Sequence, residues 1–251
     1  MSARPEGETS TFALLADIHA NVWALEAVLA DVDRRGITRL YDLGDSLYGP
    51  LDPAATADLL LERDVPSIRG NGDRLLLAEP RPPAYQASAE RLAPRHLDWL
   101  RALPETRVVL DDVLLCHGTP GSDTTYLLEP PTGEGGRLRP REEIAQDLAG
   151  VPQRLVCCGH SHIPRVVALA GGTLIVNPGS VGLPAYDDDT PAPHVMESHT
   201  PHAKYAILTR REGTWAVELI QVPYDWARAA ARATALGRPD WAAALASGWR
   251  Y

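Results

Sequence analysis

The chain has 251 residues, of which 45% are hydrophobic, and a formal net charge of −9 at pH 7 with a pI of about 5.3. This acidic balance argues against a nucleic-acid duplex or an anionic membrane as partner, since both bind basic patches. The apolar runs stay short of the ~18 residues that a membrane helix needs, and residues 1–11 lack the apolar core of a signal peptide. We therefore expect one cytoplasmic domain over residues 1–251, with residues 1–11 as a flexible tail.

The first predicted element is a buried strand over residues 12–16, and it ends abruptly at Asp17, with His19 two residues later. An apolar run of this kind is typical of a parallel sheet, and α/β sheets place ligands at the carboxyl ends of their strands. A carboxylate beside an imidazole suits a divalent transition metal better than Mg²⁺ or Ca²⁺, which favour oxygen alone. Taken alone the pair proves little, because an Asp at a strand end is more often a helix cap or a turn residue.

The next elements alternate between helix and strand. We expect helices over residues 21–35 and 52–63, with Asn21 and Asp52 as their N-caps. We expect strands over residues 40–43 and 65–68. The second strand ends in Gly44-Asp45, and the third ends in Gly70-Asn71-Gly72-Asp73. This β-α-β-α-β order is typical of parallel α/β units.

The rest of the chain is richer in hairpins. We expect short helices between residues 74 and 103, a hairpin over 107–116, a loop over 122–140, a helix over 141–148, a strand over 155–158, a hairpin over 165–176, strands over 205–209 and 215–222, and an Ala-rich helix starting near Tyr224. Because the late strands adjoin in sequence, we expect a mixed sheet or two packed sheets with helices outside.

Metal-competent side chains follow five of these strands. They are Asp17, His19, Asp45, Asn71, His117, His160 and His162, mostly with glycine beside them. Seven such groups are too many for one tetrahedral site, whereas they suit two metal ions that share a bridging carboxylate, for which Asp45 is the natural candidate. Two ions ~3.5–4 Å apart clamp the oxygens of a phosphoryl centre and lower the pKa of a water that bridges them, which indicates phosphoester hydrolysis.

Other conspicuous residues have simpler interpretations. The three cysteines, Cys116, Cys157 and Cys158, lie in apolar runs, so we expect buried free thiols, with Cys157 and Cys158 on opposite faces of a strand. The run of aspartates at 187–189 is more typical of a solvated loop than of a third metal site. Tyr48 is expected to pack rather than react.

The ordered motifs resemble a known family. Asp17-x-His19, Gly44-Asp45, Gly70-Asn71-x-Asp73, His117-Gly118 and Gly159-His160-x-His162 are similar to the five signature blocks of the calcineurin-like metallophosphoesterases, in the family's order. Further stretches resemble a small bacterial phosphodiesterase-like branch, namely Tyr48-Gly49-Pro50, Gly118-Thr119-Pro120, Asn177-Pro178-Gly179-Ser180-Val181-Gly182 and Tyr224-Asp225. The resemblance covers residues 12–247 and implies a four-layer α-β-β-α sandwich of two mixed sheets flanked by helices.

The resemblance also implies an arrangement of the site. One metal ion would take Asp17, His19, Asp45 and His162, and the other would take Asp45, Asn71, His117 and His160. The ions would be two divalent transition metals (Mn²⁺, Fe, Zn²⁺ or Ni²⁺), and the hydroxide between them would attack phosphorus in line. The catalytic residues would be Asn71, which also helps to hold the phosphate, together with Asp73 and His117.

Two departures from the family pattern bear on catalysis. Many relatives carry a His where this chain has Gly72, and that His can protonate the leaving oxygen, oriented by the residue that matches Asp73. The second departure is an additional segment over 191–202 with three histidines, His194, His199 and His202. This segment is either a mobile surface loop or the source of a replacement acid.

The functional prediction is hydrolysis of phosphodiester or activated phosphomonoester bonds. The expected partner is a small phosphate-ester substrate, with nucleotides among the candidates. The alternatives are a metal-containing binding or regulatory module with weak turnover, and a phosphoprotein phosphatase. Metal identity, physiological substrate and oligomeric state are beyond these patterns, because fold and metals alone do not select them.

Overall fold

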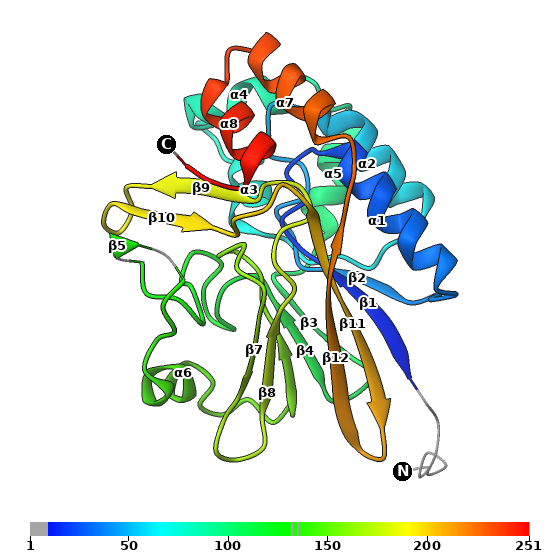
Figure 1. Ribbon diagram of the computed structural model, residues 1–251, viewed down its shortest axis with the longest axis vertical. Coiled ribbons are helices and arrows are strands. Elements are labelled where there is room, and N and C mark those ends of the chain that lie inside the picture. Colours follow the sequence, from blue (N-terminus) through cyan, green and yellow to red (C-terminus); the bar gives the residue numbers. More distant parts are fainter. Residues whose placement is uncertain (1–9, 132, 135, 251) are drawn as a thin grey trace.

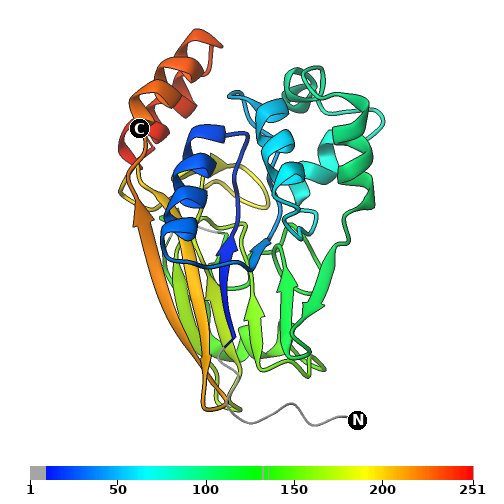
Figure 2. The same cartoon turned by 90° about the vertical axis from the view of Figure 1, so that its right-hand side faces the viewer.

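The computed structural model describes residues 10–131, 133–134 and 136–250. Two mixed sheets pack face to face, as Figures 1 and 2 show. The first has the order β12 (Thr214–Val222), β11 (Ala203–Arg211), β1 (Thr11–Leu15), β2 (Leu40–Asp42). The second has the order β3 (Thr106–Val109), β4 (Val113–Cys116), β6 (Leu155–Cys157), β8 (Leu174–Asn177), β7 (Arg165–Ala168).

Helices cover the outer faces of both sheets. The first sheet is covered by α1 (Val22–Arg34) and α2 (Pro53–Glu62), and the second is covered by α6 (Arg141–Asp147). This arrangement confirms the predicted four-layer α-β-β-α sandwich of two mixed sheets flanked by helices. Three further helices lie beside α2, namely α3 (Asn71–Leu76), α4 (Pro83–Ala89) and α5 (Pro94–Ala102).

Apolar side chains fill the space between each pair of layers. The core between the two sheets includes Phe12, whose ring meets Tyr41 and Trp215 edge-on at 5.2 and 5.6 Å. Burying one such side chain contributes roughly 1.5–3 kcal/mol. As expected, Cys157 and Cys158 point to opposite faces of their strand, because Cys157 lies in the core between the sheets and Cys158 lies under α6.

The predicted helix starts at Asn21 and Asp52 are confirmed by their hydrogen bonds. Asn21 Oδ1 accepts the Ala24 N–H at 3.2 Å, and Asp52 Oδ1 accepts the Ala55 N–H at 3.1 Å. The Ala-rich C-terminal helix is in fact two helices, α7 (Trp226–Ala235) and α8 (Pro239–Ser247), because Gly237 takes a left-handed backbone and Pro239 opens the second helix.

Three local expectations were wrong. Residues 65–68 form one bridge, between Asp42 and Ser67, rather than a strand, since Pro66 has no N–H to donate. Thr11 belongs to β1 rather than to the tail, and residues 1–9 of that tail lie outside the described residues. The segment 191–202 contains β10 (His194–Glu197), which pairs with β9 (Ala185–Asp188) and with β5 (Gly133–Glu134) in a small third sheet.

Candidate metal centre

The predicted ligands converge at one edge of the two sheets, where β1, β2, β4 and β6 end. The turns after these strands force an unusual backbone. Positive φ angles of 50–69° occur at Asp17, His19, Asp45, His160 and His162. This left-handed conformation costs a residue other than glycine on the order of 1–3 kcal/mol, and such strain clusters at functional sites.

Backbone hydrogen bonds hold these strained turns together. The Asp17 N–H donates to Gly44 O at 3.0 Å, and the His19 N–H donates to Asp45 O at 2.9 Å. The Gly159 N–H donates to His117 O at 2.8 Å. The turns after neighbouring strands therefore position one another, and the hydrogen bonds between them offset the backbone strain at each turn.

Asp17 occupies the middle of the cluster. Its side chain is fully buried, and among the described residues its Oδ1 has no hydrogen-bond partner. The Nε2 atoms of His162, His117 and His19 lie 3.4, 3.9 and 4.0 Å from that oxygen. Burying an unpaired carboxylate oxygen costs several kcal/mol unless a cation pairs with it. The residues present therefore suit a metal ion at this point.

Asp45 faces both sides of the cluster. Its Oδ2 lies 3.9 Å from His19 Nε2, and its Oδ1 lies 3.6 Å from His117 Nε2. The Gly72 N–H holds the carboxylate by donating to Oδ1 at 2.7 Å. This placement suits the predicted bridging role, since each oxygen is directed at a histidine of a different predicted site.

The candidate ligand atoms form two compact groups that share Asp17. Asp17, His19 and His162 make one group, and Asp17, Asp45 and His117 make the other, with ligand atoms within 4.8 Å of one another in each. The division of ligands between two ions stays a prediction. The structure adds Asp17 to Asp45 as a carboxylate placed near both groups.

Backbone carbonyls fix the orientation of the four histidines. Nδ1 of His19, His117 and His162 faces the carbonyl oxygens of Tyr48, Leu43 and Leu183 at 3.0, 2.8 and 2.6 Å, whereas His160 uses Nε2 toward Thr124 O at 3.2 Å. A carbonyl oxygen only accepts, so the ring nitrogen that faces it carries the proton. In neutral His19, His160 and His162 the other ring nitrogen then keeps its lone pair, as a metal ligand must, whereas Nε2 of His117 also faces an oxygen, Asn71 Oδ1 at 3.0 Å.

His160 and Asn71 lie at the margin of the cluster. The His160 ring stacks on Tyr126 at 4.4 Å and lies 5.0 Å from the His117 ring. Asn71 Oδ1 lies 3.0 Å from His117 Nε2. Both side chains also line the pocket beside the cluster, so the structure brings all seven predicted ligands together at the strand ends.

The electrostatics of the cluster indicate a missing positive charge. Burial alone would raise the pKa of Asp17, but the facing His162, His117 and His19 hold that pKa below its ordinary value. Burial lowers the pKa of His19 to about 3. Burial also raises the pKa of Asp45 to about 7, although His117 opposes the shift. Against the effect of its burial, the carboxylates Asp45 and Asp17 also raise the pKa of His117, and carboxylates crowded among imidazoles are a donor set that suits divalent cations.

Asp73 is directed away from the pocket. Its carboxylate is fully buried and accepts hydrogen bonds from the backbone N–H groups of Ser46, Leu47 and Gly70 at 3.1–3.3 Å. These contacts tie the turn after β2 to the start of α3. The predicted catalytic role of Asp73 is untested, and its contacts favour a positioning role.

The structure gives a physical reason for Gly72. A Cβ at this position would lie 3.0–3.2 Å from the Asp45 carboxylate, tighter than ordinary contact.

The hypothesis that the 191–202 segment supplies a replacement acid is not supported by its geometry. His194 is buried against Tyr126, His199 stacks on Trp249 at 4.0 Å, and His202 lies beside Trp226. The residues that line the pocket include none of the three.

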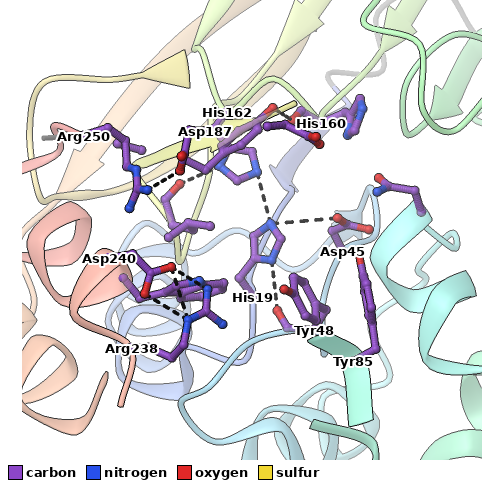
Figure 3. Close-up of a pocket in the computed structure, with 16 residues that line it drawn as sticks. His19, Asp45, Tyr48, Tyr85, His160, His162, Asp187, Arg238, Asp240 and Arg250 are labelled. Atoms are coloured by element: carbon purple, nitrogen blue, oxygen red, sulfur yellow. Dashed lines mark hydrogen bonds and ion pairs between the residues drawn. The ribbon is translucent and has the colours of Figure 1, made fainter. Parts of the chain in front are cut away.

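A cavity of about 190 Å³ opens beside the cluster. Its wall includes residues that the sequence patterns did not single out as functional, as Figure 3 shows. They are Tyr48, Tyr85, Tyr186, Asp187, Asp188, Arg238, Asp240, Trp241 and Arg250. Tyr48 was expected only to pack, and the aspartates only to be solvated. The four residues from 238 onward carry no motif, so only the fold could reveal them.

Carboxylates and imidazoles gathered at the strand ends of an α-β-β-α sandwich define the metallophosphoesterase class of proteins. The chain belongs to this class by sequence as well, since the calcineurin-like phosphoesterase superfamily domain matches residues 11–201. It is therefore a metal-dependent phosphoesterase, a hydrolase, of the calcineurin-like family.

Three similar proteins match almost the whole chain, two of them as solved structures. A metallophosphoesterase from Sphaerobacter thermophilus is 24% identical with a TM-score of 0.75, covering 96% of this chain and 100% of its own. A hypothetical protein from Pyrococcus horikoshii is 19% identical with a TM-score of 0.71, covering 96% and 99%. An uncharacterized protein from Methanocaldococcus jannaschii is 24% identical over 257 residues, covering 92% and 95%. The two solved structures share the fold of this chain.

Within the described ranges, no helix is both long and apolar enough to cross a bilayer.

Proposed function

We propose that this protein hydrolyses phosphodiester or activated phosphomonoester bonds of a small substrate with two divalent transition-metal ions. The ions would be Mn²⁺, Fe, Zn²⁺ or Ni²⁺, held by the seven predicted ligands, and the protein would work in the cytoplasm. The observation that carries the proposal is the buried, unpartnered Asp17 Oδ1, which three histidine nitrogens surround.

The bound ions would stabilise the charge of the phosphoryl transition state and acidify the attacking water. The chain supplies the positioning. The carbonyls of Tyr48 and Leu183 face Nδ1 of His19 and His162, which leaves Nε2 of these two rings free to bind metal, and the Leu43 carbonyl orients His117. Asn71 lines the pocket, with its Oδ1 3.0 Å from His117 Nε2, and would help to hold the phosphate. Because Gly72 offers no acid, the leaving oxygen takes its proton from water or departs as an anion.

Metal stoichiometry tests the proposal. Protein reconstituted with Mn²⁺ or Zn²⁺ should bind about two equivalents per chain by elemental analysis, as two shared-carboxylate groups require. Saturation at one equivalent would contradict the assignment of at least three ligands.

A substrate panel separates the remaining alternatives. The loaded protein should cleave aryl phosphodiesters faster than phosphopeptides. A protein that binds two ions yet cleaves neither would be a metal-containing binding or regulatory module, and preference for phosphopeptides would make it a phosphoprotein phosphatase. A pocket of about 190 Å³ with aromatic walls favours a small substrate.

A further inference from the structure

The outer half of the pocket lies opposite the metal ligands. We define it by its aromatic and charged members, which are Tyr48, Tyr85, Tyr186, Asp187, Asp188, Arg238, Asp240, Trp241 and Arg250. Figure 3 shows six of them, Tyr48, Tyr85, Asp187, Arg238, Asp240 and Arg250, around His19 and Asp45. They come mainly from β9 and from the ends of α8, so a substrate held at the metal ligands must place its remaining groups against them.

Both arginines of the outer half are held by aspartates. Arg238 donates from Nε and a terminal nitrogen to Asp240 at 2.9 and 2.6 Å, and its guanidinium lies 5.4 Å from the centre of the Trp241 ring. Arg250 pairs with Asp187. Asp188 adds a third carboxylate, so the described members carry three negative and two positive charges. A second phosphate would therefore meet a net charge of −1 and two guanidinium groups that are already paired.

Aromatic rings form the rest of this half. Tyr48 and Tyr85 stack at 4.1 Å with an interplanar angle of 28°. Trp241 meets the His19 ring edge-on at 5.8 Å and the Tyr48 ring at 6.1 Å. An aromatic wall thus begins directly beside a predicted metal ligand. Such rings bind flat, uncharged groups by stacking, at ~1–3 kcal/mol per nucleic-acid base.

This wall is fixed in place by the segment that the family pattern lacks. The Arg250 N–H donates to Glu197 Oε1 at 2.5 Å, and the His199 N–H donates to Gly248 O at 3.0 Å. Gly248 is left-handed, and a Cβ there would lie 2.3 Å from Thr200 N. Residues 197–200 therefore anchor the end of α8 and hold Arg250 in the outer half.

From these observations we infer that the outer half selects phosphate esters that carry one phosphate and a flat, uncharged ring system, such as a nucleoside, and rejects esters with a second phosphate. The inference rests on the proposed phosphoesterase function and deepens it. Two divalent ions beside Asp17 and Asp45 leave excess positive charge for one phosphate, and the outer half offers none for another.

A matched pair of substrates tests the charge selection. Thymidine 5′-(4-nitrophenyl phosphate) and its 3′-phosphorylated form release the same nitrophenolate and differ by one phosphate. We expect kcat/KM to be about tenfold higher for the form without the 3′-phosphate, which corresponds to about 1.4 kcal/mol. Calorimetry should show the same preference for thymidine 5′-monophosphate over thymidine 3′,5′-bisphosphate, as a readout independent of turnover.

Charge variants locate the selection in the outer half. Asp187→Asn and Asp240→Asn release Arg250 and Arg238, so each should reduce the preference about threefold or more. Asp189→Asn removes the same charge at an exposed neighbour outside the pocket and should leave the preference unchanged. An equal shift in all three variants would mean that net charge alone is responsible, and would overturn the inference.

A ring variant tests the stacking wall. Tyr85→Leu keeps an apolar side chain but removes the ring, so it should lower the preference for the thymidine ester over methyl 4-nitrophenyl phosphate by about tenfold. Equal rates on the thymidine and methyl esters in the unmodified protein would overturn the inference while leaving the proposed function intact. Failure to cleave any of these esters would instead contradict the proposed function itself.

Discussion

The metal ligands and the outer half of the pocket face each other but are built by different means. Most predicted metal ligands lie in the turns that follow β1, β2, β4 and β6, and carbonyls of neighbouring turns orient their histidines, as Tyr48 O does for His19 and Leu43 O does for His117. The outer half depends on contacts between distant segments, such as the Arg250 N–H with Glu197 and Arg250 with Asp187. Turns interlocked at the strand ends set the chemistry, whereas the packing of the end of α8 against the β9–β10 hairpin sets the shape that the substrate meets.

This difference predicts two classes of variant. A change at a metal ligand removes charge stabilisation that every substrate needs, so all activities should fall together. A change in the outer half alters contacts that only some substrates make, so it should change the ratio between substrates.

The largest effect is expected at Asp45. Asp45→Asn keeps the shape and the acceptor for the Gly72 N–H but removes the charge that faces both His19 and His117. We expect kcat/KM to fall by about 10³-fold or more on every ester, as the loss of a transition-state charge contact does.

His162→Ala serves as the comparison, since His162 belongs to only one of the two predicted metal sites, whereas Asp45 faces a histidine of each. It should lower bound metal from about two equivalents to about one, measured by elemental analysis. If Asp45→Asn instead spared one class of ester, the division between the two halves would be wrong.

An intermediate effect is expected at Gly72. Gly72→Ala brings a Cβ to 3.0–3.2 Å from the Asp45 carboxylate and should lower all rates similarly. Gly72→His adds the same crowding together with a proton donor, and general acids contribute ~10²–10⁴-fold. Relative to Gly72→Ala, the His variant should therefore be faster on alkyl esters and unchanged on nitrophenyl esters. Equal ratios in the two variants would show that leaving-group protonation does not limit the rate.

The smallest effect on activity is expected at Lys204, which lies on β11 outside the described pocket lining. Its ammonium is buried, donates to Thr200 O and His202 O at 3.1 and 3.0 Å, and burial lowers its pKa to about 8 from 10.5. At pH values between these two pKa values, Lys204 carries its proton in the unfolded chain but has lost it in the folded chain. The free energy of unfolding should therefore rise with pH across this range, by up to ~3 kcal/mol.

Lys204→Met removes the titrating group and should abolish that rise. Urea denaturation of both proteins at about pH 7.5 and about pH 9.5 measures the difference. Activity at the lower pH should stay within about twofold, as for substitutions remote from a site. A parallel rise in the variant would assign the pH dependence to other groups.

The sequence predicted the metal ligands because strand, glycine and ligand stand next to one another, as in Gly44-Asp45 and Gly159-His160. The same locality predicted the caps at Asn21 and Asp52. It failed for residues 65–68, where a proline at a sheet edge left a single bridge. It also failed for Arg238 and Arg250, whose place in the pocket depends on how α8 packs against the β9–β10 hairpin, and no local pattern encodes that packing.

The left-handed backbone at five metal ligands affects how such a chain changes over generations. At Asp17, His19, Asp45, His160 and His162, substitution by glycine would relieve roughly 1 kcal/mol of backbone strain while it removes a ligand. A glycine substitution at one of these positions therefore removes a predicted ligand and relieves backbone strain in the same step. Without selection for hydrolysis, lineages with this scaffold should drift toward stable, folded proteins that have lost their metals.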